Sequence, residues 1–166
     1  RVQAFDADGG FLFEWGMWGS GPGEFDSIWS LAVDADGNVF VGDHGNYRIQ
    51  KFDAAGNYLG EGGSYGTNPG EFESPRGLAT GPGGTVYLSE WSGRVQELLG
   101  DGTHVDEWSG GYSGLPSPFQ AWELDVDDQG IVYVVDDWNN RIQRIGCAQE
   151  STWYADFDGD LFGDDG

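Results

Sequence analysis

Residues 31–63 read LAVDADGNVFVGDHGNYRIQKFDAAGNYLGEGG, and this stretch decides the fold. It begins with short apolar runs at 31–33 and 39–41, which an Asp/Gly turn separates. A polar loop, the run Arg48–Gln50 and a second Gly-containing turn follow before the last run. Runs of β-branched and aromatic residues bounded by such turns are typical of strands. No part of the stretch has helical periodicity, so it predicts four short strands joined by tight turns.

The tripeptide Arg-(Val/Ile)-Gln occurs four times, beginning at Arg1, Arg48, Arg94 and Arg141. The intervals between the copies are 47, 46 and 47 residues. A period of that length and regularity indicates a supersecondary module that is stacked on copies of itself. The repeat therefore predicts a scaffold of successive four-stranded units.

Aligning the copies on Arg-x-Gln brings a second phrase into register. Pro22-Gly23-Glu24-Phe25 matches Pro69-Gly70-Glu71-Phe72, and Pro118-Phe119 keeps the end of the phrase. Together with residues 31–63, this phrasing closely resembles the NHL repeat, and the likeness covers residues 1 to about 146. The resemblance implies a β-propeller of four-stranded antiparallel blades with roughly six blades in a closed ring.

The expected fold class is therefore all-β, with about three and a half propeller blades in this chain. The expected repeats are residues 1–16, 17–63, 64–110 and 111–146, followed by an acidic tail at 147–166. An open arc of blades leaves apolar end faces exposed, so we expect two or three further blades upstream in a longer protein.

Composition excludes several classes of partner. The net charge is −22, from 29 acidic against seven basic residues. A nucleic-acid partner requires a basic surface, and an anionic membrane also attracts basic residues, so neither is expected. No apolar run approaches the ~18 residues of a membrane span, which excludes membrane insertion. Cys147 is the only cysteine, so no internal disulfide can form. The sequence leaves the oligomeric state open.

The acidic tail contains a candidate calcium loop. Its carboxylates follow the 1, 3, 5, 9 spacing of such loops, and a backbone carbonyl falls at position 7. The candidate ligands are Asp156, Asp158, Asp160, the carbonyl of Phe162, and Asp164. The segment resembles the Asp-rich repeats, related to thrombospondin type 3, of secreted bacterial proteins. Leu161 stands where a glycine would allow the sharp turn, and a disordered acidic tail is the alternative.

Aromatic residues gather in the loops expected on one face of the propeller. The connections between blades and between the second and third strands lie on the same face, here called the top face. Equivalent positions before the inner strand of successive blades carry Trp29, Arg76 and Trp122. The other loops of this face add His44, Tyr47, Trp91 and Trp138. Tryptophan and arginine are typical interface anchors, and flat aromatic faces also stack on sugars. Alternatively, these side chains pack between neighbouring blades.

An acidic residue precedes each internal copy of the Arg-x-Gln tripeptide. The pairs are Asp43 with Arg48, Glu90 with Arg94, and Asp136 with Arg141. A catalytic residue is rarely needed once per blade, so we interpret these pairs as structural ion pairs. His44 and His104 are the only histidines, and His104 falls on an outer strand.

Two functions remain. The first is a non-catalytic interaction module, extracellular or on a bacterial cell surface, that binds a protein, peptide or glycan through the top face. The second is a metal-dependent propeller lyase or hydrolase whose channel ligands lie mostly in upstream blades. Apart from calcium in the tail, the sequence predicts no cofactor, and we expect no catalytic residue in this chain.

Overall fold

A computed structural model of the protein describes residues 1–109 and 120–145. The strands, in chain order, are β1 (Val2–Phe5), β2 (Phe11–Trp15), β3 (Met17–Trp18), β4 (Glu24–Phe25), β5 (Ile28–Val33), β6 (Val39–Asp43), β7 (Arg48–Phe52), β8 (Tyr58–Gly62), β9 (Pro75–Thr80), β10 (Val86–Glu90), β11 (Arg94–Leu98), β12 (His104–Ser109), β13 (Ala121–Val126), β14 (Val132–Asp136) and β15 (Arg141–Ile145). Three short 3-10 helices are η1 (His44–Asn46), η2 (Pro82–Gly84) and η3 (Asp137–Asn139). No helix among the described residues has the length and apolar character needed to cross a membrane.

The strands form antiparallel sheets in which sequence neighbours pair. Strands β5 to β8 form one four-stranded sheet and β9 to β12 form the next. Strands β13 to β15 form a three-stranded sheet, and β1 with β2 forms a two-stranded one. This pattern confirms the predicted all-β architecture of propeller blades.

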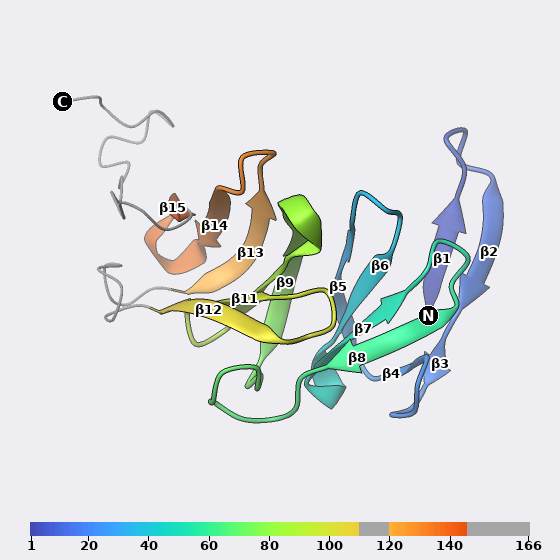
Figure 1. Ribbon diagram of the computed structural model, residues 1–166, viewed down its shortest axis with the longest axis horizontal. Coiled ribbons are helices and arrows are strands. Elements are labelled where there is room, and N and C mark those ends of the chain that lie inside the picture. Colours follow the sequence, from blue (N-terminus) through green and yellow to red (C-terminus); the bar gives the residue numbers. More distant parts are fainter. Residues whose placement is uncertain (110–119, 146–166) are drawn as a thin grey trace.

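The sheets follow one another in an arc (Figure 1). The first strand of each complete blade lies against the first strand of the next, since β5 contacts β9 and β9 contacts β13. These strands therefore line the inner side of the arc, while β8 and β12 are the outer strands of their sheets. Each inner strand begins at the same end of its sheet at which the second strand connects to the third. This end is the top face. Figure 1 draws this end downward in the sheet of β5 to β8, where η1 lies.

Apolar side chains from both faces of each sheet fill the spaces between blades. Phe40 belongs to a cluster with Leu78 and Leu88 of the next sheet, whereas its neighbour Val41 packs with Val2 on the other side. Successive strand residues point to opposite faces, so a sheet that is covered on both faces needs consecutive apolar residues. This requirement explains the unbroken triplet Val39–Val41.

The Arg-x-Gln tripeptide ties the connection between blades to the sheet. Arg48 Nε donates to Asp43 Oδ2 at 2.9 Å, and its Nη2 donates to the carbonyls of Gly21 and Glu24. Gln50 also donates to the Glu24 carbonyl, at 2.7 Å, and accepts from Gly23 N at 2.8 Å. The structure confirms the expected ion pair and adds that arginine and glutamine hold the Pro-Gly-Glu-Phe phrase.

The same arrangement recurs in the other blades. Arg94 pairs with the fully buried Glu90 and donates to the Glu71 carbonyl, and Gln96 donates to that carbonyl as well. Arg141 pairs with Asp136 at 2.8 Å. Arg1 differs, because its partner is Glu14 on the neighbouring strand and both side chains are exposed.

The turns at the end opposite the top face are closed by aspartates. Asp34 Oδ1 accepts hydrogen bonds from the backbone N–H groups of Asp36 and Asn38, and Gly37 (φ +82°) donates to the Asp34 carbonyl. Asp53 and Asp127 close their turns in the same way. Hydrogen bonds from Asn57 lower the pKa of Asp53, as expected for a carboxylate that closes a turn.

Two local features differ from the sequence prediction. The three 3-10 turns were not expected, because three residues are too few to produce a periodic pattern. The short parallel pair of β3 with β4 was also not expected, and it lies within the connection between the first two sheets. A single parallel bridge between Tyr65 and Phe72 occurs in the next connection.

Candidate functional site

Three successive inner strands bring their second residues to the top face. Trp29 is the second residue of β5, Arg76 of β9 and Trp122 of β13. Because these strands are neighbours along the inner side of the arc, their equivalent residues lie side by side. Trp91 follows β10 directly, and His44 begins η1 directly after β6. The structure thus gathers five of the seven residues that the sequence predicted for ligand binding.

The Arg76 guanidinium is the centre of this group. Its carbon atom lies over the rings of Trp29, Trp91 and Trp122, at 4.6, 4.1 and 4.1 Å from their centres. Trp91 and Trp122 also meet edge to face, with ring centres 5.8 Å apart. A cation over an indole face is attracted by the ring quadrupole, most strongly where water is partly excluded. We call Trp29, Arg76, Trp91 and Trp122 the Trp–Arg cluster.

His44 fixes the Trp29 side of the cluster. Its ring stacks on Trp29 with centres 3.8 Å apart and an angle of 6° between the planes. His44 Nδ1 lies 2.9 Å from the Pro75 carbonyl oxygen, so this nitrogen carries the proton and donates. The histidine therefore links the sheet of β5 to β8 with the residue that precedes Arg76.

Ser89 fixes the Trp122 side. Its buried hydroxyl accepts a hydrogen bond from Gly77 N at 2.9 Å and donates to the Trp122 carbonyl at 3.1 Å. A Cβ on Gly77 would lie 2.9 Å from the backbone of Glu123, so only glycine allows β13 to approach β9 this closely. The start of β13 is therefore held at a fixed distance from Arg76.

The cluster is both an interblade contact and an accessible surface. Its members come from different sheets, yet Trp29, Trp91 and Trp122 keep 48%, 44% and 43% of their surfaces exposed. Burial lowers the pKa of the Arg76 guanidinium. Burial also raises the pKa of the Glu123 carboxyl, which belongs to the residue directly after Trp122. The two alternatives for these tryptophans, packing and display, are thus compatible. Their role in ligand binding stays a prediction.

Two predicted site residues lie apart from the cluster. Tyr47 stands edge to face against Tyr65, with ring centres 4.8 Å apart, and its backbone is left-handed (φ +55°). Trp138 belongs to η3 and is 62% exposed, and no ring contact is found for it within the described residues. Tyr65 was not predicted, although it is the repeat equivalent of Trp18 in the preceding connection, and each forms a parallel bridge to the phenylalanine that ends the Pro-Gly-Glu-Phe phrase.

The candidate calcium ligands between Asp156 and Asp164 lie outside the described residues. Within residues 1–109 and 120–145, no group of three or more His, Cys, Asp or Glu side chains is arranged to hold a metal ion. His104 begins β12, the outer strand of its sheet.

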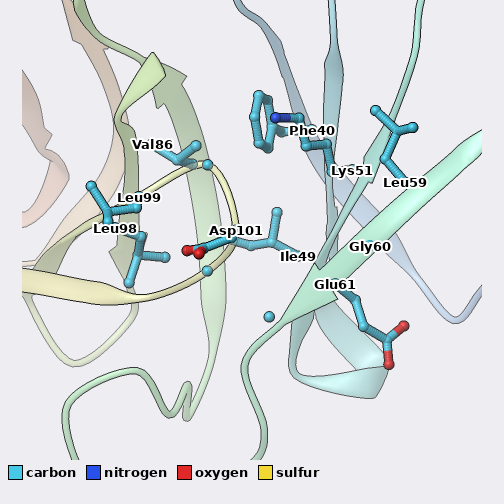
Figure 2. Close-up of a pocket in the computed structure, with 13 residues that line it drawn as sticks. Phe40, Ile49, Lys51, Leu59, Gly60, Glu61, Val86, Leu98, Leu99 and Asp101 are labelled. Atoms are coloured by element: carbon cyan, nitrogen blue, oxygen red, sulfur yellow. The ribbon is translucent and has the colours of Figure 1, made fainter. Parts of the chain in front are cut away.

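A cavity of about 280 Å³ opens between two neighbouring sheets, away from the predicted site. Figure 2 shows it between β8 and the β11–β12 turn, with Ile49 and Leu98 on facing sides. Its apolar floor belongs to the interblade core, which also contains Phe40 and Val86. Lys51 Nζ lies over the Phe40 ring at 5.0 Å. The cavity is therefore a gap in blade packing, and none of the residues that line it belongs to the Trp–Arg cluster.

Comparison with known proteins identifies the repeat and the fold. The family model of the NHL repeat matches residues 25–52. No curated protein matches the sequence significantly. A catalytically inactive virginiamycin B lyase from Staphylococcus aureus, solved with quinupristin, is 20% identical, with 97% of this chain covering 50% of that one and a TM-score of 0.65.

Two other solved structures are similar in fold. A streptogramin B lyase is 19% identical, and the match covers 92% of this chain and 46% of the lyase with a TM-score of 0.64. The WD40 repeats of RRP9 are 16% identical, with 92% and 44% covered and a TM-score of 0.69. The chain thus spans about half the length of the structures that it matches. Residues 25–52 match the NHL repeat, and the described residues fold as blades of a β-propeller.

Proposed function

We propose that this chain is a non-catalytic interaction module that binds a protein partner, through a peptide segment, at the Trp–Arg cluster of its top face. The observation that carries the proposal is the convergence of three tryptophans on one arginine from three successive sheets. Tryptophan and arginine are the side chains that most often dominate binding energy at protein interfaces. A solvent-exposed group of this kind on a rigid scaffold is suited to binding.

A peptide fits this surface better than a glycan does. Sugar binding by tryptophan requires an open, flat ring face. The Trp29 ring already stacks on His44 and contacts Arg76, and the Trp122 ring contacts both Arg76 and Trp91. The flat faces are therefore partly occupied, whereas ring edges and the arginine remain for a peptide. An extracellular or cell-surface location is part of the proposal and derives from the resemblance of the acidic tail to repeats of secreted proteins.

A random peptide library displayed on phage tests the proposal. The full chain is immobilised, and peptides are selected on it in parallel with a Trp29→Ala/Trp122→Ala variant. We expect peptides that are enriched on the unchanged protein and not on the double variant. Trp18→Ala is the control, because Trp18 is 82% exposed and lies outside the cluster. Thermal unfolding of each variant shows whether the fold is kept.

Other outcomes would overturn the proposal. Equal enrichment on the double variant would place binding elsewhere. Retention on a glycan array, without any selected peptide, would assign the face to sugars.

A metal-dependent lyase or hydrolase is the second candidate. The observation that favours it is the similarity in fold to a virginiamycin B lyase and to a streptogramin B lyase. Elemental analysis of the natural full-length protein, together with turnover of quinupristin, tests it. Stoichiometric metal whose loss abolishes turnover would replace the interaction module by the enzyme.

A further inference from the structure

The Arg76 side chain has no hydrogen-bonding or ionic partner within the described residues. Its contacts are with the faces of three indole rings, and these faces accept no conventional hydrogen bond. Its Nε atom is buried and unpartnered. An unpaired buried donor costs free energy, so a group that accepts from this guanidinium would be bound favourably. The side chain is only half-buried, which leaves it accessible from solvent.

The environment of Arg76 differs from that of the other five arginines. Arg1, Arg48, Arg94 and Arg141 form ion pairs with carboxylates of the chain, and Arg144 on β15 is exposed to solvent. In a protein with 29 acidic residues, a half-buried arginine without a carboxylate partner is unusual. Its pKa is lowered by burial alone, with no contribution from a nearby carboxylate. The cluster therefore surrounds a positive charge that the fold itself leaves unneutralised.

We propose that Arg76 binds a carboxylate of the peptide ligand, so that the Trp–Arg cluster is a receptor for an acidic peptide. This inference rests on the proposed function and names the chemistry of its ligand. A guanidinium presents a planar fork of N–H donors that matches the two oxygens of a carboxylate. The surrounding indoles hold the fork and lower the local polarity, which strengthens a charge-assisted hydrogen bond.

The charge of the whole chain selects a singly charged group. A net charge of −22 repels anions over the range of a Debye length, and the repulsion grows with the charge of the ligand. A single arginine offsets this repulsion for one carboxylate but not for a phosphate dianion or a polyanion. The receptor is thus specific for a peptide with an isolated acidic group between apolar residues, whose side chains contact the half-exposed tryptophans.

The frame around Arg76 is preorganised. The hydrogen bond from His44 Nδ1 to the Pro75 carbonyl fixes the orientation of the His44 ring. Ser89 bridges Gly77 to Trp122 through its hydroxyl. Binding therefore requires little ordering of the protein, which preserves affinity for a small ligand.

Two short peptides test the proposal: acetyl-Phe-Glu-Phe-amide and acetyl-Phe-Gln-Phe-amide, which differ only in a carboxylate against a carboxamide. Binding to the full chain is measured by tryptophan fluorescence at pH 7. A carboxylate that pairs with the guanidinium should make the Glu peptide bind roughly tenfold to a hundredfold more tightly than the Gln peptide. Arg76→Gln should abolish the difference, so that the two peptides bind with similar affinity, and Arg76→Lys should keep only part of the preference.

Arg144→Gln is the matched control, because it removes the same charge from an exposed residue of β15, outside the cluster. It should keep the preference for the Glu peptide. Equal binding of the two peptides, or a preference that survives Arg76→Gln, would overturn the carboxylate receptor alone. Stronger competition by inorganic phosphate than by acetate would overturn the selection of a singly charged group. If neither peptide binds and the phage library yields none, the proposed function fails together with this inference.

Discussion

The guanidinium carbon of Arg76 lies 4.1 Å from the centre of the Trp122 ring, although the two residues belong to neighbouring sheets. The contact therefore joins two blades at the top face through side chains, because the backbone hydrogen bonds of β9 and β13 belong to separate sheets. It is also half-exposed, so water weakens it relative to a buried pair. The contribution of the Arg76–Trp122 contact to the free energy of unfolding can be measured.

A double-mutant cycle on Arg76 and Trp122 measures that energy. Arg76→Met and Trp122→Leu are made singly and together, and urea unfolding gives the free energy of unfolding of each protein. The cation–π contact should appear as a coupling of about 0.5–1 kcal/mol. A coupling near zero would mean that the two side chains are neighbours without mutual attraction.

The buried carboxylate of Asp43 should be far more important for stability than an exposed one. Asp43 is fully buried and accepts from Arg48 Nε, from the backbone of Asp26 and from Asn46. Asp43→Ala leaves the buried arginine without this partner, and we expect a loss of about 3–5 kcal/mol in the free energy of unfolding.

Glu14→Ala is the control for this loss. The Arg1–Glu14 pair is exposed, with 62% and 40% of the side-chain surfaces accessible, so its removal should cost less than about 1 kcal/mol. Similar losses for the two variants, in urea unfolding, would contradict a structural role for the repeated pair.

The sequence predicted the blades because their requirements are local and repeated. Apolar triplets such as Val39–Val41, Asp/Gly turns and the Asp43–Arg48 pair all recur at one spacing, and each has a direct physical reason in the structure. The repeat also predicted which loops share a face, since an antiparallel sheet returns alternate connections to the same end.

The contacts within the site could not be predicted in the same way. Equivalence placed Trp29, Arg76 and Trp122 in successive blades but said nothing of distance between side chains. That distance depends on the close approach of β9 and β13, which Gly77 permits and Ser89 fixes. Neither residue carries a pattern in the sequence. Gln50 was likewise missed as a partner of the interblade connection, because its bond to Glu24 spans blade elements far apart in the chain.

Gly62 should tolerate alanine much less well than Gly60. Both glycines lie in β8 and neither has a left-handed backbone. A Cβ on Gly62 would lie 2.7 Å from Gly102 Cα of the neighbouring sheet, whereas one on Gly60 meets nothing within 4 Å. Gly62→Ala should therefore push the two sheets apart and lower the free energy of unfolding by about 1–3 kcal/mol.

Gly60→Ala should be neutral or stabilising by about 0.4–1 kcal/mol, because alanine restricts the unfolded chain. Thermal and urea unfolding of the two variants makes the comparison. Equal effects would show that the sheets do not approach each other closely at Gly102.

The carboxyl of Glu97 should make stability depend on pH in a direction opposite to that of the turn aspartates. Burial raises its pKa above the ordinary value of 4.5, the Asp106 carboxylate adds to the rise, and a hydrogen bond from Tyr87 partly offsets it. A raised carboxyl pKa means that the folded protein holds this proton more tightly than the unfolded chain does. Stability is therefore lost as pH rises from 4.5 through the folded pKa, and the full penalty is present at neutral pH.

Glu97→Gln removes that penalty and keeps an acceptor for the Tyr87 hydroxyl. The variant should be more stable than the unchanged protein at pH 7, and the difference should disappear below about pH 4.5, where the glutamate is protonated in both states. Glu73→Gln is the control for net charge, because Glu73 is exposed and its loss removes the same charge. Thermal unfolding at a series of pH values between about 3.5 and 7.5 measures both. An identical gain for the two variants at pH 7 would assign the effect to overall charge and contradict a specific role for burial of Glu97.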